Sequence, residues 1–554
     1  MKLALFHAQT KEHKDTKLIS KSPFWGDLGR PLLLKGLGRP FLLKSIFNKS
    51  QSSEIKKLKL ISKSPLWGDL GGSVLRKNLG RSLLWKNFVL LLIVFFTSCN
   101  DFLTQELKGD YTSENFYTSP QAATTAVNAV YNSLYGNTLW IFGDVASDDA
   151  VKGGNAGDQA DINAINDFSA SSDNGVINTF WQSTYETIAR ANNAITYITP
   201  MTFDATLRNQ LVGEAKFLRA FSYFNLVNIF GKVPLKLEPQ LTAATINVPL
   251  SEVPAIYAQI EKDLTEAIPV LPVLYTTEVG RITKGAAYGL LAKAQLYQQK
   301  YAESLTNIQA LETLNQYTLL SNYADLFKAG SEDSTEVIFA IRFVRSTISS
   351  IGNILNVNFS PSIEGGYYFD APTQSYVDAF TDKTTAGADD PRLDASIGRE
   401  GKPWFNDTIF SASWSEATGY LVKKYNENTI PTIPKDQSTV PYIYMRYADI
   451  LLMKAEALNE SGANGVATAA IEVNKIRVRA QLAPTSATTQ DALRTVIQNE
   501  RRKELGFEFH RFFDLMRWGQ ATAEAALGPD FKWTAPRFYF PLPQLELDTN
   551  QALK

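Results

Sequence analysis

Histidine and cysteine are almost absent from this 554-residue chain, and their scarcity excludes several classes of protein. Cys99 is the only cysteine, so no disulfide can form within the chain. Histidine occurs only at positions 7, 13 and 510, so His510 is the single one after Cys99. The sequence therefore excludes a zinc site built on several histidines and argues against a histidine-dependent catalytic triad.

Catalytic motifs and excess positive charge are missing as well. The HExxH and GxSxG patterns and the phosphate-binding Walker loop do not occur, so hydrolase and nucleotide chemistry lack a sequence signal. Residues 1–98 hold 18 Lys and Arg against 5 Asp and Glu, which leaves 37 basic and 51 acidic residues in the remainder. That acidic remainder has the wrong sign for binding nucleic acid or anionic lipid through a positive field.

A short apolar stretch before Cys99 has the layout of a secretory signal. Residues 87–99 read NFVLLLIVFFTSC and follow basic residues at positions 77, 81 and 86. The apolar run is shorter than the roughly 20 residues that span a membrane. A cysteine after small polar residues resembles the bacterial lipobox, although Phe96 departs from that pattern. We expect residues 87–98 to be the apolar part of a signal peptide and Cys99 to carry a lipid; the alternative is a buried free cysteine.

Residues 1–86 contain a duplication. Lys17–Leu28 (KLISKSPFWGDL) recurs at Lys59–Leu70 (KLISKSPLWGDL) with a single difference. A solenoid needs at least three copies with a consistent buried face, and two basic copies broken by Gly and Pro supply neither. We predict that residues 1–86 are disordered or belong to a misassigned translation start.

Apolar residues at helical spacing predict a series of helices after residue 119. Small residues at helix crossings, with a tyrosine at the turn near residue 301, are typical of tetratricopeptide-type helical pairs. Asn137–Gly175 interrupts the series as a long polar excursion, a kind of segment that is usually functional or mobile. The predicted helices are Pro120–Tyr135, Phe180–Ile198, Asp204–Phe230, Pro254–Ile268, Thr283–Gln299, Ile443–Leu458, Asn464–Ala480 and Gln490–Gly506.

Residues 317–440 have a different character. Strand-like pieces such as Glu336–Val344 (EVIFAIRFV) alternate there with loops rich in Gly, Pro and Asp. Phe538–Pro543 is expected to be extended near the end of the chain. The predicted fold class is mostly α: a tetratricopeptide-like scaffold of helical pairs at about 115–316 and 441–535, with an inserted irregular, loop-rich lobe containing short strands at about 317–440.

Four stretches together resemble the SusD/RagB family of outer-membrane nutrient-binding lipoproteins. They lie in the family's order behind a lipoprotein signal and cover essentially all of residues 99–554, which we identify as a SusD-like domain. FPLPQ at 540–544 follows them, and residues 1–86 lie outside the resemblance. The four stretches are Gly213–Leu235 (GEAKFLRAFSYFNLVNIFGKVPL), Arg281–Tyr297 (RITKGAAYGLLAKAQLY), Met445–Glu460 (MRYADILLMKAEALNE) and Glu500–Gly519 (ERRKELGFEFHRFFDLMRWG).

The resemblance implies a helical scaffold whose irregular lobe faces outside, on a surface-exposed lipoprotein anchored in the outer membrane by its lipid. It also implies a partner, a SusC-like TonB-dependent transporter that the lipoprotein covers like a lid. Ligands in the family are typically oligosaccharides, and some members serve peptides. The expected function is therefore capture of oligosaccharide nutrients and their delivery to the transporter, with neither catalysis nor a cofactor.

Charged residues in the third and fourth stretches recur at three- and four-residue steps. Such steps put side chains on one helix face, where opposite charges can pair. We interpret them as charge-laced helical faces rather than catalytic groups, and we expect Tyr444 to face inward at helix spacing. The charged residues are Arg446, Asp449 and Lys454 in the third stretch and Glu504, Glu508, Arg511 and Asp514 in the fourth.

Aromatic and polar residues gather at three places where a sugar could bind. A sugar ring offers an apolar C–H face to an aromatic plate, and its hydroxyls need flanking polar groups. Each aromatic could instead belong to the core, but the Gly- and Asp-rich loops favour binding at the first two places. The predicted ligand-binding residues are Trp140, Phe142, Asp144, Asp148 and Asp149, then Tyr367, Tyr368 and Asp370. The third place holds Trp404, Phe405, Asn406 and Trp414.

Other functions stay open at the level of sequence. A lipoprotein of the same fold could bind peptides or another nutrient, and a purely scaffolding protein would bind no soluble ligand. A carbohydrate-active hydrolase would need two carboxyl groups roughly 5–10 Å apart in a cleft. Saturable oligosaccharide binding without products would favour the receptor over the enzyme.

Overall fold

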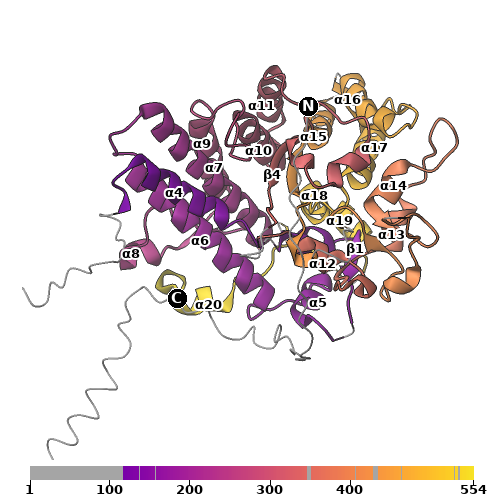
Figure 1. Cartoon of the computed structure of the whole chain (residues 1–554), viewed down its shortest axis with the longest axis horizontal. Helices are drawn as coiled ribbons and strands as arrows, with labels where there is room; N and C mark the ends of the chain where they lie inside the picture. Colours follow the sequence, from indigo (N-terminus) through magenta and orange to yellow (C-terminus); the bar gives the residue numbers. More distant parts are fainter. Residues whose placement is uncertain are drawn as a thin grey trace, which may run out of the picture. The chain divides into compact units, whose positions relative to one another are not determined.

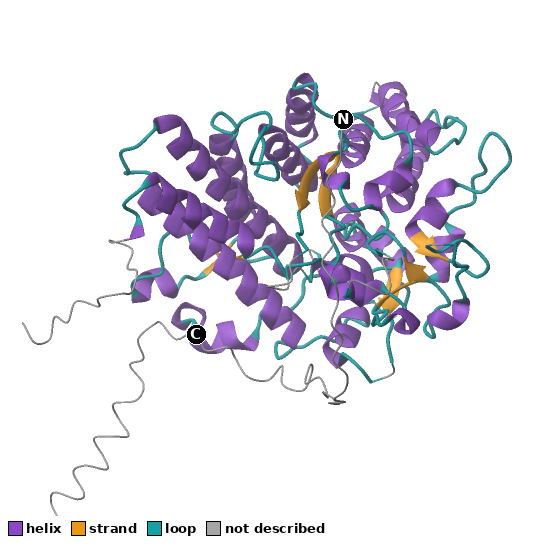
Figure 2. Cartoon of the chain, in the orientation of Figure 1, coloured by secondary structure: helices purple, strands orange, loops and turns teal. Residues whose placement is uncertain are grey.

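The computed structural model describes residues 116–554 except 137, 156, 346–350, 406, 428–433, 463–464, 530 and 535–536. Cys99, the signal stretch, the duplication and Asn406 lie outside the described residues, so the expectations placed on them stay predictions. Helices dominate the described part and strands are short (Figure 2), which confirms the predicted mostly α class. None of the described helices combines the length and the hydropathy needed to cross a membrane.

The first group of helices packs around α7 (Figure 1). Every residue of α7 from Phe217 to Phe230 is buried, which is expected of a helix enclosed on all sides. Asp204 caps its start by accepting a hydrogen bond from the Leu207 amide (2.8 Å). The group comprises α4 (Pro120–Asn132), α6 (Gly175–Ile198), α7 (Ala205–Phe230), α9 (Val253–Ala267), α10 (Lys284–Tyr297) and α11 (Tyr301–Thr313), with a four-residue α8 (Ala243–Ile246) between α7 and α9.

The second group of helices continues the scaffold. α15 packs on α11, α16 and α17, so the pairs α10–α11 and α15–α16 stack as in a tetratricopeptide array. A Cβ at Gly289 of α10 would overlap the sulfur of Met445, which lies on the strand at 442–446, so this small residue allows close packing against a strand. The group comprises α15 (Tyr447–Glu460), α16 (Val466–Arg479), α17 (Gln490–Leu505), α18 (Arg511–Trp518), α19 (Gln520–Leu527) and the terminal α20 (Gln544–Thr549).

Two predicted helix starts are wrong. Residues 442–446 form a strand, β8, and α15 begins only at Tyr447. The backbone there is extended because β8 pairs with β4 (Val337–Ile341) and all five of its residues are buried, including Tyr444. α6 begins at Gly175 instead of Phe180, because Asn174 accepts hydrogen bonds from the amides of residues 176 and 177.

The segment between α11 and α15 is built from short elements, as predicted for an irregular lobe. The β4–β8 pair joins its two ends in antiparallel register, with Val337 opposite Arg446. A second antiparallel pair, β1–β5, brings Lys152 opposite Asp370 and so attaches the 137–175 excursion to the lobe. Between β4 and β8 lie α12 (Leu355–Phe359), β5 (Asp370–Pro372), α13 (Gln374–Asp378), α14 (Pro391–Ser396), β6 (Ile397–Gly398) and β7 (Leu421–Val422). β1 spans Ala150–Lys152, and β2 (Val233–Pro234) pairs with β3 (Leu250–Ser251) outside the lobe.

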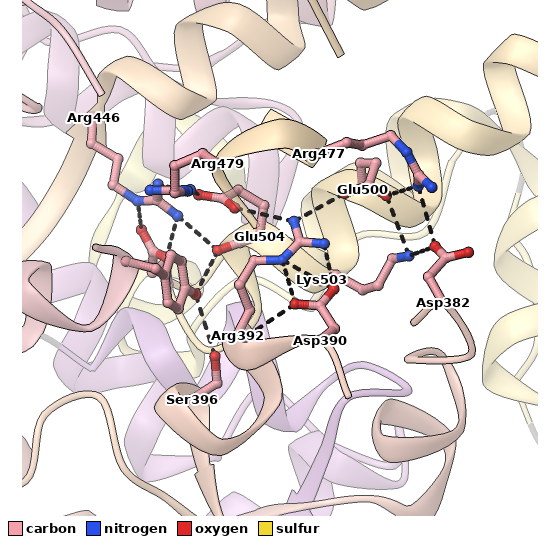
Figure 3. A network of polar contacts seen from close by, with 12 residues as sticks. Asp382, Asp390, Arg392, Ser396, Arg446, Arg477, Arg479, Glu500, Lys503 and Glu504 are labelled. Atoms are coloured by element: carbon pink, nitrogen blue, oxygen red, sulfur yellow. Dashed lines mark hydrogen bonds and ion pairs between the residues drawn. The ribbon is translucent and has the colours of Figure 1, made fainter. Parts of the chain in front are cut away.

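A buried network of ion pairs holds the lobe on the second helical group (Figure 3). Arg446 of β8 donates to Glu504 (2.6 Å) and Glu508 (2.7 Å). Arg392 of α14 donates to Glu500 (2.9 Å) and to the same Glu504 (3.2 Å). Because these side chains are almost fully buried, each charge depends on its partners rather than on water.

Pairing within a helix accounts for only part of the charged ladders: Asp514 pairs with Arg517 three residues on (2.8 Å), whereas the charged residues of α15 pair with other elements. Asp449 pairs with Lys293 of α10 (3.1 Å) and Arg501 of α17 (2.9 Å). Lys454 pairs with Glu312 of α11 (2.9 Å). These residues face neighbouring elements because the helices are packed on several sides, so their ion pairs are tertiary contacts and not a solvated stripe.

Candidate functional site

The first predicted cluster lies largely inside the protein. Trp140 is 2% exposed and packs edge-to-face on Phe359, with ring centroids 5.3 Å apart. Phe142 is fully buried between Phe180 and Phe540. Neither ring has an open face in this conformation, so neither can serve as a stacking plate for a sugar. The π-helical turn at 141–145 turns both aromatic rings into the core.

The acidic members of the first two clusters are brought together by the β1–β5 pair. Asp144, Asp149 and Asp370 are fully buried, and neither oxygen of Asp370 has a hydrogen-bond partner among the described residues. Burial and the charges of Asp370 and Asp149 raise the pKa of Asp144 well above its ordinary value. Burial, followed by the Asp149 charge, does the same to the pKa of Asp370. These carboxyl groups do not face an open surface.

Asp148 and Asp149 are held by arginines from the second helical group. Arg511 donates to both oxygens of Asp148, at 2.7 and 2.9 Å. Arg502 donates to Asp149 at 2.6 Å. The backbone next to these pairs bonds to Thr373, which follows β5, so the pairs fix the excursion and the lobe to the scaffold. The geometry of these two ion pairs indicates that they position the loops that follow.

Tyr367 and Phe369 form the clearest aromatic surface of the lobe. Their rings are stacked, with centroids 5.3 Å apart and planes 24° apart, and both side chains are half-buried. The Lys152 ammonium lies 5.8 Å from the centroid of Phe369. Gly154 lies so close that a Cβ there would meet the Phe369 ring at 2.8 Å. The pair therefore has one face against the 152–155 loop and is partly open to solvent.

Tyr368, between them, points the other way and joins the third predicted cluster. Its hydroxyl donates to Asn155 Oδ1 (3.1 Å), and its ring packs in one hydrophobic cluster with Trp404 and Phe410. Phe405 and Trp414 are half-buried on the outside of that cluster. The second and third predicted clusters thus become neighbours, separated by 34 or more positions in the sequence but joined through Tyr368.

Sequence reasoning missed Phe369, Lys152 and Asn155 at this surface. Phe369 is two positions after Tyr367, but Tyr368 between them has a positive φ of 41°, so the alternation of an extended strand would not have predicted that the two rings stack. Lys152 and Asn155 could not have been found, because the β1–β5 register alone brings them beside the lobe. A surface of this kind can stack a sugar ring and hydrogen-bond its hydroxyls.

No catalytic arrangement is evident among the described residues. The buried carboxylates of Figure 3 are paired with arginine or lysine, and the charges of Arg479, Arg446 and Arg392 hold the pKa of Glu504 well below its usual range despite its burial. Burial and the Lys293 charge lower the pKa of His510 to about 3, which keeps it neutral. No group of three or more His, Cys, Asp or Glu side chains in the described ranges is arranged to hold a metal ion.

Two family models match the chain. A model described as "SusD family" matches residues 335–554, and one described as "Starch-binding associating with outer membrane" matches residues 100–296. A SusD-like protein, P2 from Formosa agariphila, is 28% identical over 512 residues, which cover 84% of this chain and 97% of the relative. The matches together run through both helical groups and the lobe.

Solved structures show the same fold. A SusD superfamily protein from Bacteroides vulgatus superposes with a TM-score of 0.70 at 26% identity, covering 79% of this chain and 98% of that one. A structure described as a laminarin binding SusD-like protein superposes with a TM-score of 0.66 at 29% identity, covering 78% of this chain and 98% of that one. The folds therefore correspond over nearly the full length of the two solved proteins and over 78–79% of this chain.

Proposed function

This chain is a SusD-like protein, and we propose that it is a cell-surface lipoprotein that binds oligosaccharides and passes them to a SusC-like TonB-dependent transporter. Similarity to a laminarin-binding protein at 29% identity supports carbohydrate as the ligand class. The family model that describes association with the outer membrane supports the location. Cys99 would supply the lipid anchor, as its place after an apolar signal stretch suggests.

The observation that carries the proposal is the stacked pair Tyr367–Phe369. Two stacked, half-buried aromatic rings on an irregular lobe leave apolar surface that a ligand can cover. The neighbouring Lys152, the carbonyl-bearing amide of Asn155 and the indole of Trp414 supply hydrogen-bonding and further stacking groups. The surface thus combines the two contact types that a neutral oligosaccharide needs.

Binding without turnover is the second part of the proposal. Asp149 and Asp370 are buried and Asp148 is bound by Arg511, whereas Asp158 and Glu416 are exposed and lie close enough to Tyr368 to act on it electrostatically. A glycosidase needs one carboxyl group to donate a proton and another to act on the sugar from the opposite side. Asp148, Asp149 and Asp370 do not present such a pair to solvent.

The test is calorimetric titration of the purified protein with laminarihexaose, together with chromatography of the mixture. We expect saturable binding at one site on the lobe and unchanged laminarihexaose after prolonged incubation. A panel of other oligosaccharides and of short peptides follows if laminarihexaose does not bind. Release of shorter sugars would contradict the proposed receptor function. Binding of peptides alone would favour the alternative, a protein of the same fold that binds peptides.

A further inference from the structure

A pocket lies among the helices of the scaffold. Residues of α10, α15, α17, α18 and α19 and the start of α11 enclose a volume of about 250 Å³. That is smaller than the roughly 300–1,000 Å³ typical of sites for drug-sized ligands, so it suits one ring and not an extended chain. Trp518 and Tyr301 are half-buried in its wall, and Leu296 and Ile497 are buried beneath it.

The charged groups of this pocket neutralise one another. Arg517 binds both oxygens of Glu456, one of them at 2.8 Å, and the Trp518 indole N–H donates to the same carboxylate (3.3 Å). Arg494 binds both oxygens of Glu460, at 2.8 and 2.6 Å. Bidentate pairs of this geometry leave little net charge to attract an ion.

Neutral polar groups in the pocket are, by contrast, free. The side chains of Tyr301, Gln299, Gln498 and Thr522 make no hydrogen bond to any other described residue. Together they provide two hydroxyls and two amides, each able both to donate and to accept. The half-buried Tyr301 ring supplies the aromatic wall of the pocket, since the Trp518 ring is covered by the guanidinium groups of Arg517 and Arg511, 5.1 and 6.0 Å from its centroid.

We infer that this pocket is a binding site for a single neutral sugar ring, separate from the oligosaccharide surface of the lobe. The aromatic wall takes the apolar face of the ring, and the free hydroxyl and amide groups take its hydroxyls. The two arginine–glutamate pairs line the pocket without adding net charge to it. The ring can belong to a free monosaccharide or to the end of a longer glycan, because the pocket is open on one side.

The experiment is a saturation-transfer NMR titration of the folded protein with D-glucose, D-galactose, D-mannose and L-fucose, and with D-glucuronate as the charged counterpart. We expect at least one neutral sugar to bind saturably, and D-glucuronate to bind at least tenfold more weakly than D-glucose or not at all. Tyr301→Phe and Gln498→Ala should each weaken the binding by about tenfold. Gln309→Ala, a matched change at an exposed glutamine of α11, should leave it unchanged.

Variants at each of the two sites distinguish binding at the lobe from binding in the pocket. Tyr367→Ala should weaken laminarihexaose binding by about tenfold and leave the monosaccharide titration unaltered, so the proposed function can fail while this inference holds. Both pocket substitutions remove only polar groups, and their melting temperatures verify that the protein stays folded. The inference is overturned by the absence of saturable binding for all four neutral sugars, by binding that survives both pocket substitutions, or by preference for D-glucuronate.

Discussion

At the residue scale, burial divides the aromatic side chains of the predicted site into two groups. Trp140 and Phe142 are enclosed by other aromatic rings, whereas Tyr367 and Trp414 keep part of their surface open. Composition and loop position could not separate them, because both groups lie in Gly- and Asp-rich segments. The difference depends on which other rings pack there, and those come from Phe180, Phe359 and Phe540.

Replacement of Tyr367 by alanine is expected to weaken laminarihexaose binding by about tenfold, roughly 1.4 kcal/mol, because a stacking plate is lost. The melting temperature should stay nearly unchanged, since the ring is half-exposed. Trp140→Ala is the matched control and should instead lower the free energy of unfolding by about 3–5 kcal/mol through the cavity it creates. Calorimetric titration and thermal unfolding measure the two effects. A large loss of stability in Tyr367→Ala would contradict the exposed role.

His510 gives a pH dependence whose sign follows from its burial. Its pKa is lowered from 6.5 to about 3 by burial and by Lys293, whose ammonium is 3.3 Å from the ring nitrogen Nδ1. The unfolded chain therefore binds a proton below about pH 6.5 that the folded protein does not bind until about pH 3. His510 thus makes the free energy of unfolding fall as the pH is lowered through this window.

The measurement is urea unfolding of the wild type and of His510→Gln between pH 7.5 and pH 4. The difference in unfolding free energy between the two proteins should change in favour of the variant as the pH falls. Comparing the two cancels the opposite contribution of Asp144 and Asp370, whose raised pKa values make acid favour the folded state. If the difference in unfolding free energy between the two proteins did not depend on pH, His510 would not be a buried, neutral side chain.

At the scale of elements, the sequence located most helices but not the faces they present. Spacing of apolar residues predicted α7 and α10 to within two residues at each end. The prediction failed at β8, where the spacing of Tyr444 and Ala448 also fits a helix. The backbone is extended there because β8 pairs with β4, which lies more than 100 residues away in the sequence. The regular spacing of charged residues in α15 and α17 was likewise visible in the sequence, yet their ion-pair partners lie on α10, α11 and α14.

Glu504 is the shared acceptor of the buried network in Figure 3, and its loss should loosen the lobe. Glu504→Gln leaves Arg446, Arg392 and Arg479 short of a counter-charge in the interior. We expect the free energy of unfolding to fall by about 3–5 kcal/mol, as when one partner of a buried pair is removed. Chemical denaturation followed by circular dichroism measures it.

The matched control for this change is Asp491→Asn on the same helix. The Asp491 side chain is 90% exposed and pairs only with Arg494 three residues on, so its removal should leave stability unchanged. Equal effects of the two substitutions would mean that the network contributes no more than a surface ion pair. Increased protease cleavage within residues 317–440 of Glu504→Gln would independently report detachment of the lobe.

At the scale of the whole molecule, the lobe and the helical scaffold are not two consecutive segments of the sequence, because the lobe is inserted within the scaffold. The lobe is inserted between α11 and α15, and the 137–175 excursion joins it through β1. Arg502 and Arg511 of the second helical group bind Asp149 and Asp148 of the 137–175 excursion. A ligand surface on the lobe is therefore supported by residues from both ends of the described chain.

Attachment to the membrane is predicted to depend on Cys99 alone. Cys99→Ala should move the protein from the membrane fraction to the soluble fraction, because the acidic remainder of the chain has no positive field to hold it on anionic lipid. Metabolic labelling with a fatty acid and fractionation of the cells measure the change. Cys99→Ser serves as the conservative comparison, and retention of either variant in the membrane would contradict the anchor.

The sequence by itself determined the family resemblance, the mostly α class and the position of most helices, because apolar periodicity and capping residues are local properties. Only the tertiary structure decided which aromatic rings stay open and which acids are paired. Burial of Trp140 and the counter-charges of Glu504 come from residues distant in sequence. A side chain's environment depends on contacts across the fold, and those contacts leave no local signal at the residue itself.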